Sequence, residues 1–532
     1  MRATSIGHAG ILIETAHGSI LCDPWFVPAF FGSWFVFPRN DQLSDELRDK
    51  IEHPDFLYVS HLHADHLDEA FLAEHVSRDA TVLVPGFPTH ELERRMQALG
   101  FRNVLRTEDQ LEQDLGGITV AIHVETSITD GPGGDSALVV SDGTARLVNQ
   151  NDCRTHDLDA LRSHGPVDLH WLQYSGAIWY PMVYEEPPER MRELCDSKVE
   201  SQFARAMRYV EHIGARYIVP SAGPPVFLDP ELARFNVVTG DELSIFPDQR
   251  AFLTRLESSG FAGILAIPGT VIEIDAPDGP ARVEHPLPDE AVDRIFTRKA
   301  EYLAEYAADW APWLDREKAG WAAPADDLFD RLKAWWEPLL ALAPTLRTAV
   351  GAAALLRTGD LEVLIDFPSG EVRHYAGEDH RFRFDIPREL VETVAAQHAV
   401  DWSNALFLSC RFRAWRDGPF NEYLYNFFKS LSVERMRRAE AEAHRKLEPF
   451  DDDLSEEIEC DGYVFERFCP HRHADLSVFG EIEDGTLTCT LHGWRFDLDT
   501  GRCLTASDRS LRVRPAAAPN SGATITSGGS PG

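Results

Sequence analysis

Two cysteine–histidine pairs near the end of the chain constrain most strongly what it folds into. Cys469 and His471 form a C-x-H pair, and Cys489 and His492 form a C-x-x-H pair, with 17 residues between the two pairs. This order is typical of a [2Fe–2S] cluster in which two histidines replace two cysteines, whereas a structural zinc site favours C-x-x-C pairs. The motif therefore predicts a redox cluster, and structural zinc is the alternative.

The residues around these pairs resemble the Rieske ferredoxin-like domain over residues 456–513. Residues 492–501 are typical of a ligand loop followed by a strand and a tight turn. The resemblance implies that Cys469 and Cys489 bind one iron and that His471 and His492 bind the other. We expect such a cluster to carry single electrons for redox chemistry in this protein or its partner.

A second group of metal-ligand side chains lies in the N-terminal half. An apolar strand at residues 56–59 runs into the motif H-x-H-x-D-H. His61 and His63 share one face of an extended backbone, and Asp65 and His66 begin the next turn. Imidazole and carboxylate together suit zinc, iron or manganese. Four ligands in six residues predict two adjacent metal ions, and a chance histidine cluster in a polar loop is the alternative.

This segment resembles the metallo-β-lactamase fold, and so do the opening hairpin at residues 5–25 and the strand at residues 147–153. The resemblance implies that Asp152 bridges the two metals. It also makes His123 the candidate for the third-motif histidine. The alternative for His123 is a half-buried strand histidine without a ligand role.

The last histidine of the metallo-β-lactamase pattern is missing, because the strand at residues 217–220 leads to Ser221. This departure predicts a metal with fewer protein ligands and open positions for O₂ or substrate. His8 and Asp135 are expected to support the ligands or to face the substrate.

Both sites together resemble the CMP-N-acetylneuraminate hydroxylases, a family that combines these two domains. The loops that carry this resemblance lie at residues 22–25 with 33–35, 60–67, 176–182 and 220–224, and Asp135 and Asp152-Cys153 stand at the relative spacing of the family. In that family the Rieske domain comes first, whereas here it is C-terminal. Residues 131–134 are Gly-Pro-Gly-Gly where a histidine is expected. Oxygenase chemistry therefore carries over better than a sialic-acid substrate does.

The two sites predict a monooxygenase in which the Rieske cluster reduces a nonheme diiron centre. A ferredoxin or a reductase using NAD(P)H would donate the electrons, and O₂ would hydroxylate or N-oxygenate a small polar substrate, such as a nucleotide-linked or amino sugar. A neighbouring subunit of a homo-oligomer could supply the cluster. The alternatives are a zinc hydrolase of the lactonase or phosphodiesterase type with a Rieske redox sensor, and a non-catalytic electron carrier. The expected metal ligands are His61, His63, Asp65, His66, His123 and Asp152.

Charge and hydropathy limit the partners. The chain has 51 basic and 87 acidic residues and a net charge of −36, which disfavours nucleic acid and anionic membrane surfaces. A phosphate-bearing substrate would need a local basic pocket. No apolar run reaches the roughly 18 residues of a membrane-spanning helix. Met1 and Arg2 lead directly into the first expected strand, without the apolar region of a signal peptide, so we expect a cytoplasmic protein.

Periodicity predicts α/β and α+β domains in series. An αββα metallo-β-lactamase-like sandwich is expected over residues 1–285, a helix-rich α+β middle region over 286–448, a small all-β Rieske domain over 449–515 and a disordered tail over 516–532. The middle region has a helix–hairpin–helix order similar to a sterol-carrier module. Its expected elements are helices at 289–313, 326–336, 387–398 and 421–446 and a hairpin at 361–372.

Overall fold

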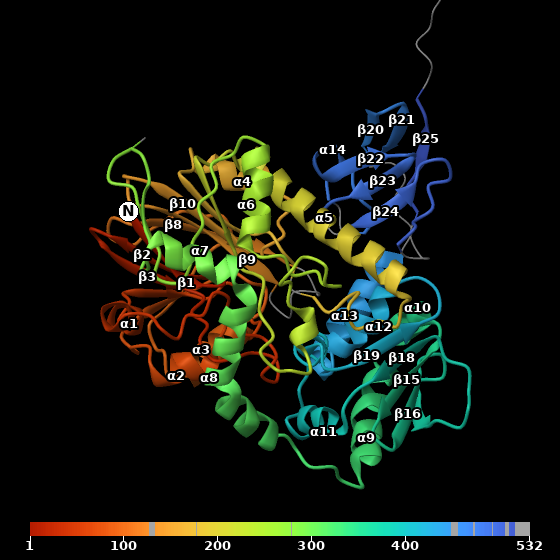
Figure 1. Ribbon diagram of the computed structural model, residues 1–532. Helices are drawn as coiled ribbons and strands as arrows, with labels where there is room; N and C mark the ends of the chain where they lie inside the picture. The colour runs from red at the N-terminus through yellow and green to blue at the C-terminus, as the bar shows by residue number, and fades with distance from the viewer. Residues whose placement is uncertain are drawn as a thin grey trace, which may run out of the picture. The chain divides into compact units, whose positions relative to one another are not determined.

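The computed structural model describes residues 1–126, 134–176, 178–277, 279–447, 456–471, 474–491, 493–505 and 510–516. It divides into two compact units, Met1–Glu448 and Pro449–Gly532, which are considered separately. Most of the acidic linker and nearly all of the expected tail, like His492, lie outside the described residues. Figure 1 shows the elements of both units in chain order.

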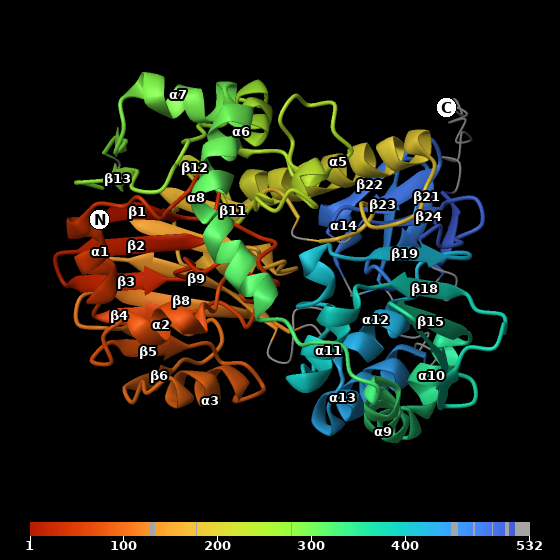
Figure 2. The same cartoon turned by 60° about the horizontal axis from the view of Figure 1, so that its bottom comes forward.

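The first unit begins with a sandwich of two β-sheets (Figure 2). The first sheet is mixed: β1 pairs antiparallel with β2 and β2 with β3, while β3 to β6 run parallel. As a result β1, β3 and β4 all point the same way. The strands, in sheet order, are β14 (Arg282–Glu284), β13 (Val271–Glu273), β1 (Arg2–Gly7), β2 (Gly10–Thr15), β3 (Gly18–Cys22), β4 (Phe56–Tyr58), β5 (Thr81–Val84) and β6 (Val104–Arg106).

The second sheet has six strands. β10, β11 and β12 run parallel, and β9 runs antiparallel to β10 and to β8. The start of β9 therefore lies at the edge where β10 ends. The strands, in sheet order, are β12 (Tyr217–Ser221), β11 (Leu169–Gln173), β10 (Arg146–Asn151), β9 (Asp135–Ser141), β8 (Thr119–Glu125) and β7 (Gln113–Asp114).

Alternation along the strands separates the two cores of the sandwich. Ile11 and Ile13 on β2 pack between the sheets against Ile122 and Leu138. Leu12, between them, packs on the opposite face with the helical layer. Successive side chains of a strand point to opposite faces, so a strand covered on both sides reads as a continuous apolar run.

Helices cover the outer faces of both sheets (Figures 1 and 2). Amphipathic periodicity over residues 198–212 predicts a helix with Phe203, Met207 and Val210 facing inward, and these three residues are buried in α5. The helix expected over 289–313 is instead two helices, because the backbone of Arg298 leaves the helical conformation. The helices are α1 (Asp45–Glu52), α2 (Glu69–Glu74), α3 (Glu91–Ala98), α4 (Leu158–Ser163), α5 (Pro188–Ile213), η2 (Ala233–Phe235), α6 (Gln249–Ser258), α7 (Asp289–Thr297) and α8 (Lys299–Ala319).

The middle region is a five-stranded sheet packed with helices. The expected hairpin is confirmed as β16 and β17. The strands, in sheet order, are β17 (Glu371–His374), β16 (Leu361–Asp366), β15 (Ala353–Thr358), β18 (Phe382–Asp385) and β19 (Arg413–Arg416), and the helices are α9 (Leu328–Ala341), α10 (Pro344–Val350), α11 (Arg388–Ala396), η3 (Phe407–Ser409), α12 (Glu422–Lys429) and α13 (Val433–Leu447).

Two helix boundaries in the middle region differ from the expectation. α9 continues through Pro338, because the buried Trp336 and Leu339 hold both sides of the proline in the core. The single helix expected over 421–446 is two helices. Its backbone turns away after Lys429, where the Leu431 amide donates to the Val400 carbonyl at 2.9 Å.

The second unit contains two small antiparallel sheets. Their pairing puts Cys489 at the end of one strand and Trp494 at the start of the next. The described elements are β20 (Glu457–Cys460), β21 (Tyr463–Glu466) and β25 (Val513–Pro515) in one sheet, β22 (Gly480–Glu483), β23 (Thr486–Cys489) and β24 (Trp494–Asp497) in the other, and α14 (Leu476–Phe479).

Across the parts of the chain that the structure describes, none of the helices combines the length and the apolar character needed to span a bilayer.

Candidate metal centre

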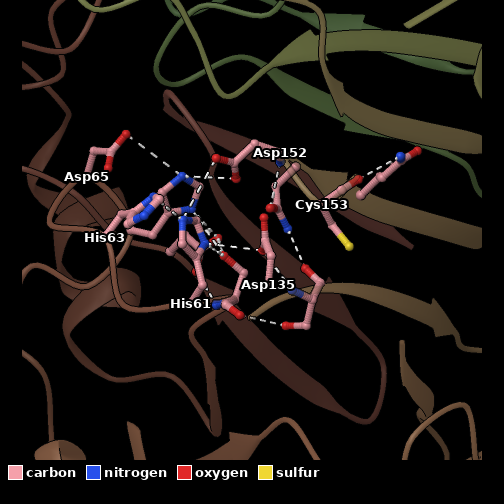
Figure 3. Close-up of polar contacts among 12 residues, drawn as sticks. His61, His63, Asp65, Asp135, Asp152 and Cys153 are labelled. Carbon is pink, nitrogen blue, oxygen red and sulfur yellow. Dashed lines mark hydrogen bonds and ion pairs between the residues drawn. The ribbon is translucent and has the colours of Figure 1, made fainter. Parts of the chain in front are cut away.

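The candidate metal ligands meet at one edge of the sandwich because of strand direction. His8 follows the end of β1, Asp23 follows β3, and His61 lies just beyond β4, so the three parallel strands deliver them to the same edge of the first sheet. In the second sheet, Asp152 follows β10, and Asp135 opens the antiparallel β9. Figure 3 shows the carboxylates of Asp135 and Asp152 next to the histidine loop.

One group of possible metal ligands consists of His61, His63 and Asp152. His61 Nε2 lies 2.8 Å from His63 Nδ1 and 3.8 Å from Asp152 Oδ2. Two ring nitrogens that face each other at this distance are held together by a shared proton or by a metal ion. The group therefore has the composition and convergence of a divalent-metal site.

A second group consists of His8, Asp65 and His66. Asp65 Oδ2 lies 3.1 Å from His8 Nε2 and 3.9 Å from His66 Nε2. His66 Nε2 is also 3.3 Å from Asp152 Oδ1. The two oxygens of Asp152 thus face different groups, which is the arrangement of a carboxylate that bridges two metals.

Carboxylates behind the histidines set the direction of their rings. Asp23 Oδ2 lies 2.9 Å from His66 Nδ1 and Asp135 Oδ1 lies 3.3 Å from His61 Nδ1. Ser60 donates from its amide and its hydroxyl to the two oxygens of Asp23, both at 2.7 Å. A histidine held through Nδ1 presents Nε2 to a metal, and such partners tune metal affinity.

Most side chains of the two ligand groups are buried, and burial makes their charges interact strongly. Burial alone would lower the pKa of His61, but Asp135 and Asp152 outweigh it and raise that pKa to about 9. Burial, with the neighbouring His61, lowers the pKa of His63 to about 3. Burial would raise the pKa of Asp65, yet His66 and His8 hold it well below its usual range.

Unsatisfied polar atoms test whether a metal fits this cluster. Buried polar atoms usually have hydrogen-bond partners. Four atoms of the ligand-group residues are buried without one among the described residues. They are His63 Nε2, Asp65 Oδ1, His66 Nε2 and Asp152 Oδ1. Nitrogen and carboxylate oxygen donors left open in this way fit bound divalent metal ions.

In the second unit, the described candidate cluster ligands lie on two loops. Cys469 and Cys489 are fully buried and His471 is 8% exposed. The His471 ring stacks on Trp494, with ring centroids 4.0 Å apart and planes 12° apart. The Cys469 amide donates to the Ala474 carbonyl at 2.9 Å, which tightens the first loop.

The chain matches known families in three places. Residues 19–221 match the Beta-lactamase superfamily domain, residues 328–445 an Rv3818-like, SCP2-like domain, and residues 450–513 the Rieske [2Fe-2S] domain. Rv3818 of Mycobacterium tuberculosis, which bears the name of a Rieske 2Fe-2S iron-sulfur protein, is 46% identical over 524 residues, covering 96% of this chain and 99% of that protein. This chain belongs to the Rv3818 family.

A second member of the Rv3818 family comes from Mycolicibacterium smegmatis and is 45% identical over 531 residues, covering 97% of this chain and all of that protein. Among solved structures, CmlA, a diiron β-hydroxylase from Streptomyces venezuelae, has 14% sequence identity and a TM-score of 0.33, over 53% of this chain and 54% of its own. The domain matches confirm the predicted fold class, including the sterol-carrier-like middle region. The resemblance to CMP-N-acetylneuraminate hydroxylases stays a prediction.

In this Rv3818 family member, His123 lies outside both groups of possible metal ligands among the described residues. Its Nε2 lies 2.8 Å from His164 Nε2. The reason is the alternation of β8: Ile122 points between the sheets, so its neighbour His123 points to the opposite face. The stretch at residues 131–134 lies mostly outside the described residues.

Sequence reasoning missed the parts of the site that depend on strand order. His8 was expected only to support the ligands or face the substrate, yet it lies within ligand distance of Asp65 and His66. Asp23 and Ser60 were not singled out. A polar residue directly after a buried strand, as in both cases, was the available signal.

Proposed function

We propose that the chain is an oxidoreductase in which a Rieske cluster passes single electrons to a two-iron centre at the edge of the sandwich. The centre would use O₂ to hydroxylate or N-oxygenate a small polar substrate. The observation that carries this proposal is the pair of adjacent ligand groups, with the two oxygens of Asp152 facing His61 of one group and His66 of the other, in a chain that also has a Rieske domain. Hydrolysis needs no source of electrons, whereas O₂ activation does.

Several side chains would hold the metals. His61, His63 and Asp152 would bind one iron, and His8, Asp65 and His66 would bind the other, with Asp152 shared between them. Bound there, the iron pair would supply the reduction of O₂ with electrons from the cluster. The cluster itself would be bound by Cys469, His471, Cys489 and His492.

The protein's own groups have three tasks in this proposal. Asp23 and Asp135 fix the rings of His66 and His61 so that their Nε2 atoms face the metals. Burial of His8, His61, Asp65 and His66 limits the access of bulk water to these groups. Asp152, which follows the end of β10, is half-buried, so part of its side chain is accessible to solvent.

A zinc-dependent hydrolase with a Rieske redox domain is the second candidate. The observation that favours it is the donor set, because imidazole and carboxylate bind zinc as readily as iron. Three further expectations apply only to the oxygenase. They are a ferredoxin or NAD(P)H-dependent reductase as electron donor, a nucleotide-linked or amino sugar as substrate, and a homo-oligomer that brings the two centres together.

Metal and sulfide analysis separates the two candidates. Protein purified without oxygen would be analysed for iron, zinc and acid-labile sulfide, and the dithionite-reduced form would be examined by low-temperature EPR. The oxygenase requires about four irons and two sulfides per chain with a Rieske-type signal. About two irons and two sulfides with zinc would support the hydrolase, and absence of sulfide would refute both.

Stoichiometric O₂ consumption by the reduced protein then tests the reaction class. Asp152→Ala should abolish it while leaving the Rieske signal intact, because Asp152 is shared by both ligand groups and lies outside the Rieske unit. Asp55→Ala, which removes an exposed carboxylate bound to Ser19, is the matched control. Equal O₂ consumption by Asp152→Ala and the parent protein would contradict the proposal.

A further inference from the structure

One face of α5 carries a polar stripe that does not point to solvent. Lys198, Gln202, Arg205 and Tyr209 follow one another at intervals of four, three and four residues, so they lie on one side of the helix. Gln202, Arg205 and Tyr209 are only 2%, 4% and 2% exposed, and Lys198 is half-buried. Such a stripe needs either polar partners or a ligand.

Arg205 has no acidic partner among the described residues. Its Nη2 is buried without a hydrogen-bond acceptor, and the Oε1 of Gln202, one turn earlier, is likewise unsatisfied. Burial lowers the pKa of Arg205 to about 9, and Arg154 contributes in the same direction. An isolated buried cation is costly, so an uncompensated one marks a place where an anion would be stabilised.

Two further cationic side chains, Arg154 and Lys198, interact electrostatically with Arg205. Arg154, half-buried, stands two residues after Asp152 at the carboxyl end of β10. Burial, together with Arg154 and Arg205, lowers the pKa of Lys198 to about 7. Neither Arg154 nor Lys198 has an ion-pair partner in the portion of the chain that the structure describes. The chain has 87 acidic residues for 51 basic ones, so three neighbouring cations without an ion pair among the described residues are unexpected from composition.

These cations lie beside the candidate metal centre. Tyr209, one turn after Arg205 on this face of α5, donates to the Thr155 carbonyl at 3.1 Å, which holds the helix against the segment that follows Asp152. Asp152 is also among the charges that act on Arg205. Close to Gln202, Gly176 leaves no space for a side chain, since an added Cβ would lie 2.0 Å from Gln202 Nε2. The loop after β11 thus packs directly on this face of α5.

We propose that Arg154, Lys198 and Arg205 bind an oxyanion group of the substrate, a phosphate or a carboxylate, next to Asp152. Guanidinium and ammonium groups recognise both oxyanions through charge-assisted hydrogen bonds. The proposal names a substrate class for the function proposed above and rests on the metal centre being the reaction site. It also accounts for how a strongly acidic protein accepts an anionic substrate.

Anion binding to the full-length, metal-loaded protein tests the proposal. Calorimetric titrations with inorganic phosphate and with acetate, at constant ionic strength, would be compared for the parent protein, Arg205→Met and Lys198→Met. The matched control is Arg192→Met, which removes an exposed arginine of the same helix whose Nη2 donates to the Asp241 carbonyl. We expect Arg205→Met and Lys198→Met to bind the anions at least about tenfold more weakly than the parent protein does. The affinity of the control should change by no more than about twofold.

Thermal unfolding separates a binding role from a structural one. Without anion, Arg205→Met should unfold at the same temperature as the parent protein or higher, because an unpaired buried cation is lost. Phosphate should raise the unfolding temperature of the parent protein but not of Arg205→Met. A lower unfolding temperature for Arg205→Met, with parent-like anion binding by Lys198→Met, would assign the cations a structural role and overturn the proposal.

The remaining outcomes also decide the question. Stronger binding of phosphate than acetate would assign a phosphate-bearing substrate, and the reverse a carboxylate. An anion held by the metals alone would bind Arg205→Met and Lys198→Met as tightly as the parent protein, which overturns the proposal, as does absence of binding of either anion. The titrations involve neither O₂ nor electrons, so zinc in place of iron would defeat the oxygenase and leave this result standing.

Discussion

His8 Nε2 lies 3.1 Å from Asp65 Oδ2, although the two residues are 57 positions apart in the chain. The contact exists because β1 and β4 run parallel in one sheet and end at the same edge. His8 also lies beside the end of β12, where the chain has Ser221 instead of the histidine of the metallo-β-lactamase pattern, because the Ala222 amide donates to the His8 carbonyl at 3.0 Å.

His8→Ala should remove about one metal ion per chain from the N-terminal site, because only Asp65 and His66 of that ligand group would remain. Elemental analysis with labile-sulfide normalisation measures this loss. His123→Ala is the matched control, since His123 is equally buried but contacts His164 instead of the ligand groups. Equal metal loss in both variants would refute a ligand role for His8.

Asp23→Asn should weaken metal binding about 10- to 100-fold without removing a ligand. The Asp23 carboxylate holds His66 Nδ1 at 2.9 Å, and an amide would no longer fix the ring in the same protonation state. Competition with a chelator measures the affinity. Asp55→Asn, at a carboxylate that also accepts from a serine but outside the site, should leave affinity unchanged.

Cys489→Ser should abolish the Rieske EPR signal and the labile sulfide while leaving the N-terminal metals in place. Cys489 is fully buried at the end of β23, and the N-terminal ligands belong to the other compact unit. Cys503→Ser replaces a buried cysteine of the same unit outside the C-x-x-H pair and should retain the signal. Retention of the sulfide by Cys489→Ser would refute its assignment as a ligand.

The stability of the metal-free protein should fall as pH rises from 6.5 to 9. His61 has a pKa of about 9 in the folded chain against 6.5 for an ordinary histidine, so its contribution is complete below pH 6.5 and is lost as pH rises through 9. The expected loss reaches about 3 kcal/mol. Urea unfolding of metal-free protein at pH 6.5 and pH 9 measures it.

Two controls isolate the source of this pH dependence. Asp135→Asn removes one of the two carboxylates that raise the pKa of His61 and should weaken the dependence, while Asp152 still acts on His61. Bound metal keeps the imidazole unprotonated, so the metal-loaded protein should show less of it. A parent-like pH dependence in Asp135→Asn would contradict this origin.

Local patterns were enough to predict several features. The ligand spacing at Cys469, His471, Cys489 and at His61–His66 lies within a few residues of chain. Strand alternation and helical periodicity are equally local, and they predicted the sandwich, the β16–β17 hairpin and the buried face of α5. Helix ends were less predictable, as the break at Arg298 and the continuous helix at Pro338 illustrate. Tertiary packing decides whether a breaker is tolerated.

Sequence alone determined which residues of this protein are candidate metal ligands and where along the chain they stand, because donor chemistry and spacing are properties of short segments. Only the tertiary structure decided that His8 joins Asp65 and His66, that His123 faces away, and that Arg205 is buried with an unsatisfied Nη2. Those outcomes depend on strand direction and on which face of a strand or helix meets its neighbour. Both are set by the packing of residues far apart in sequence.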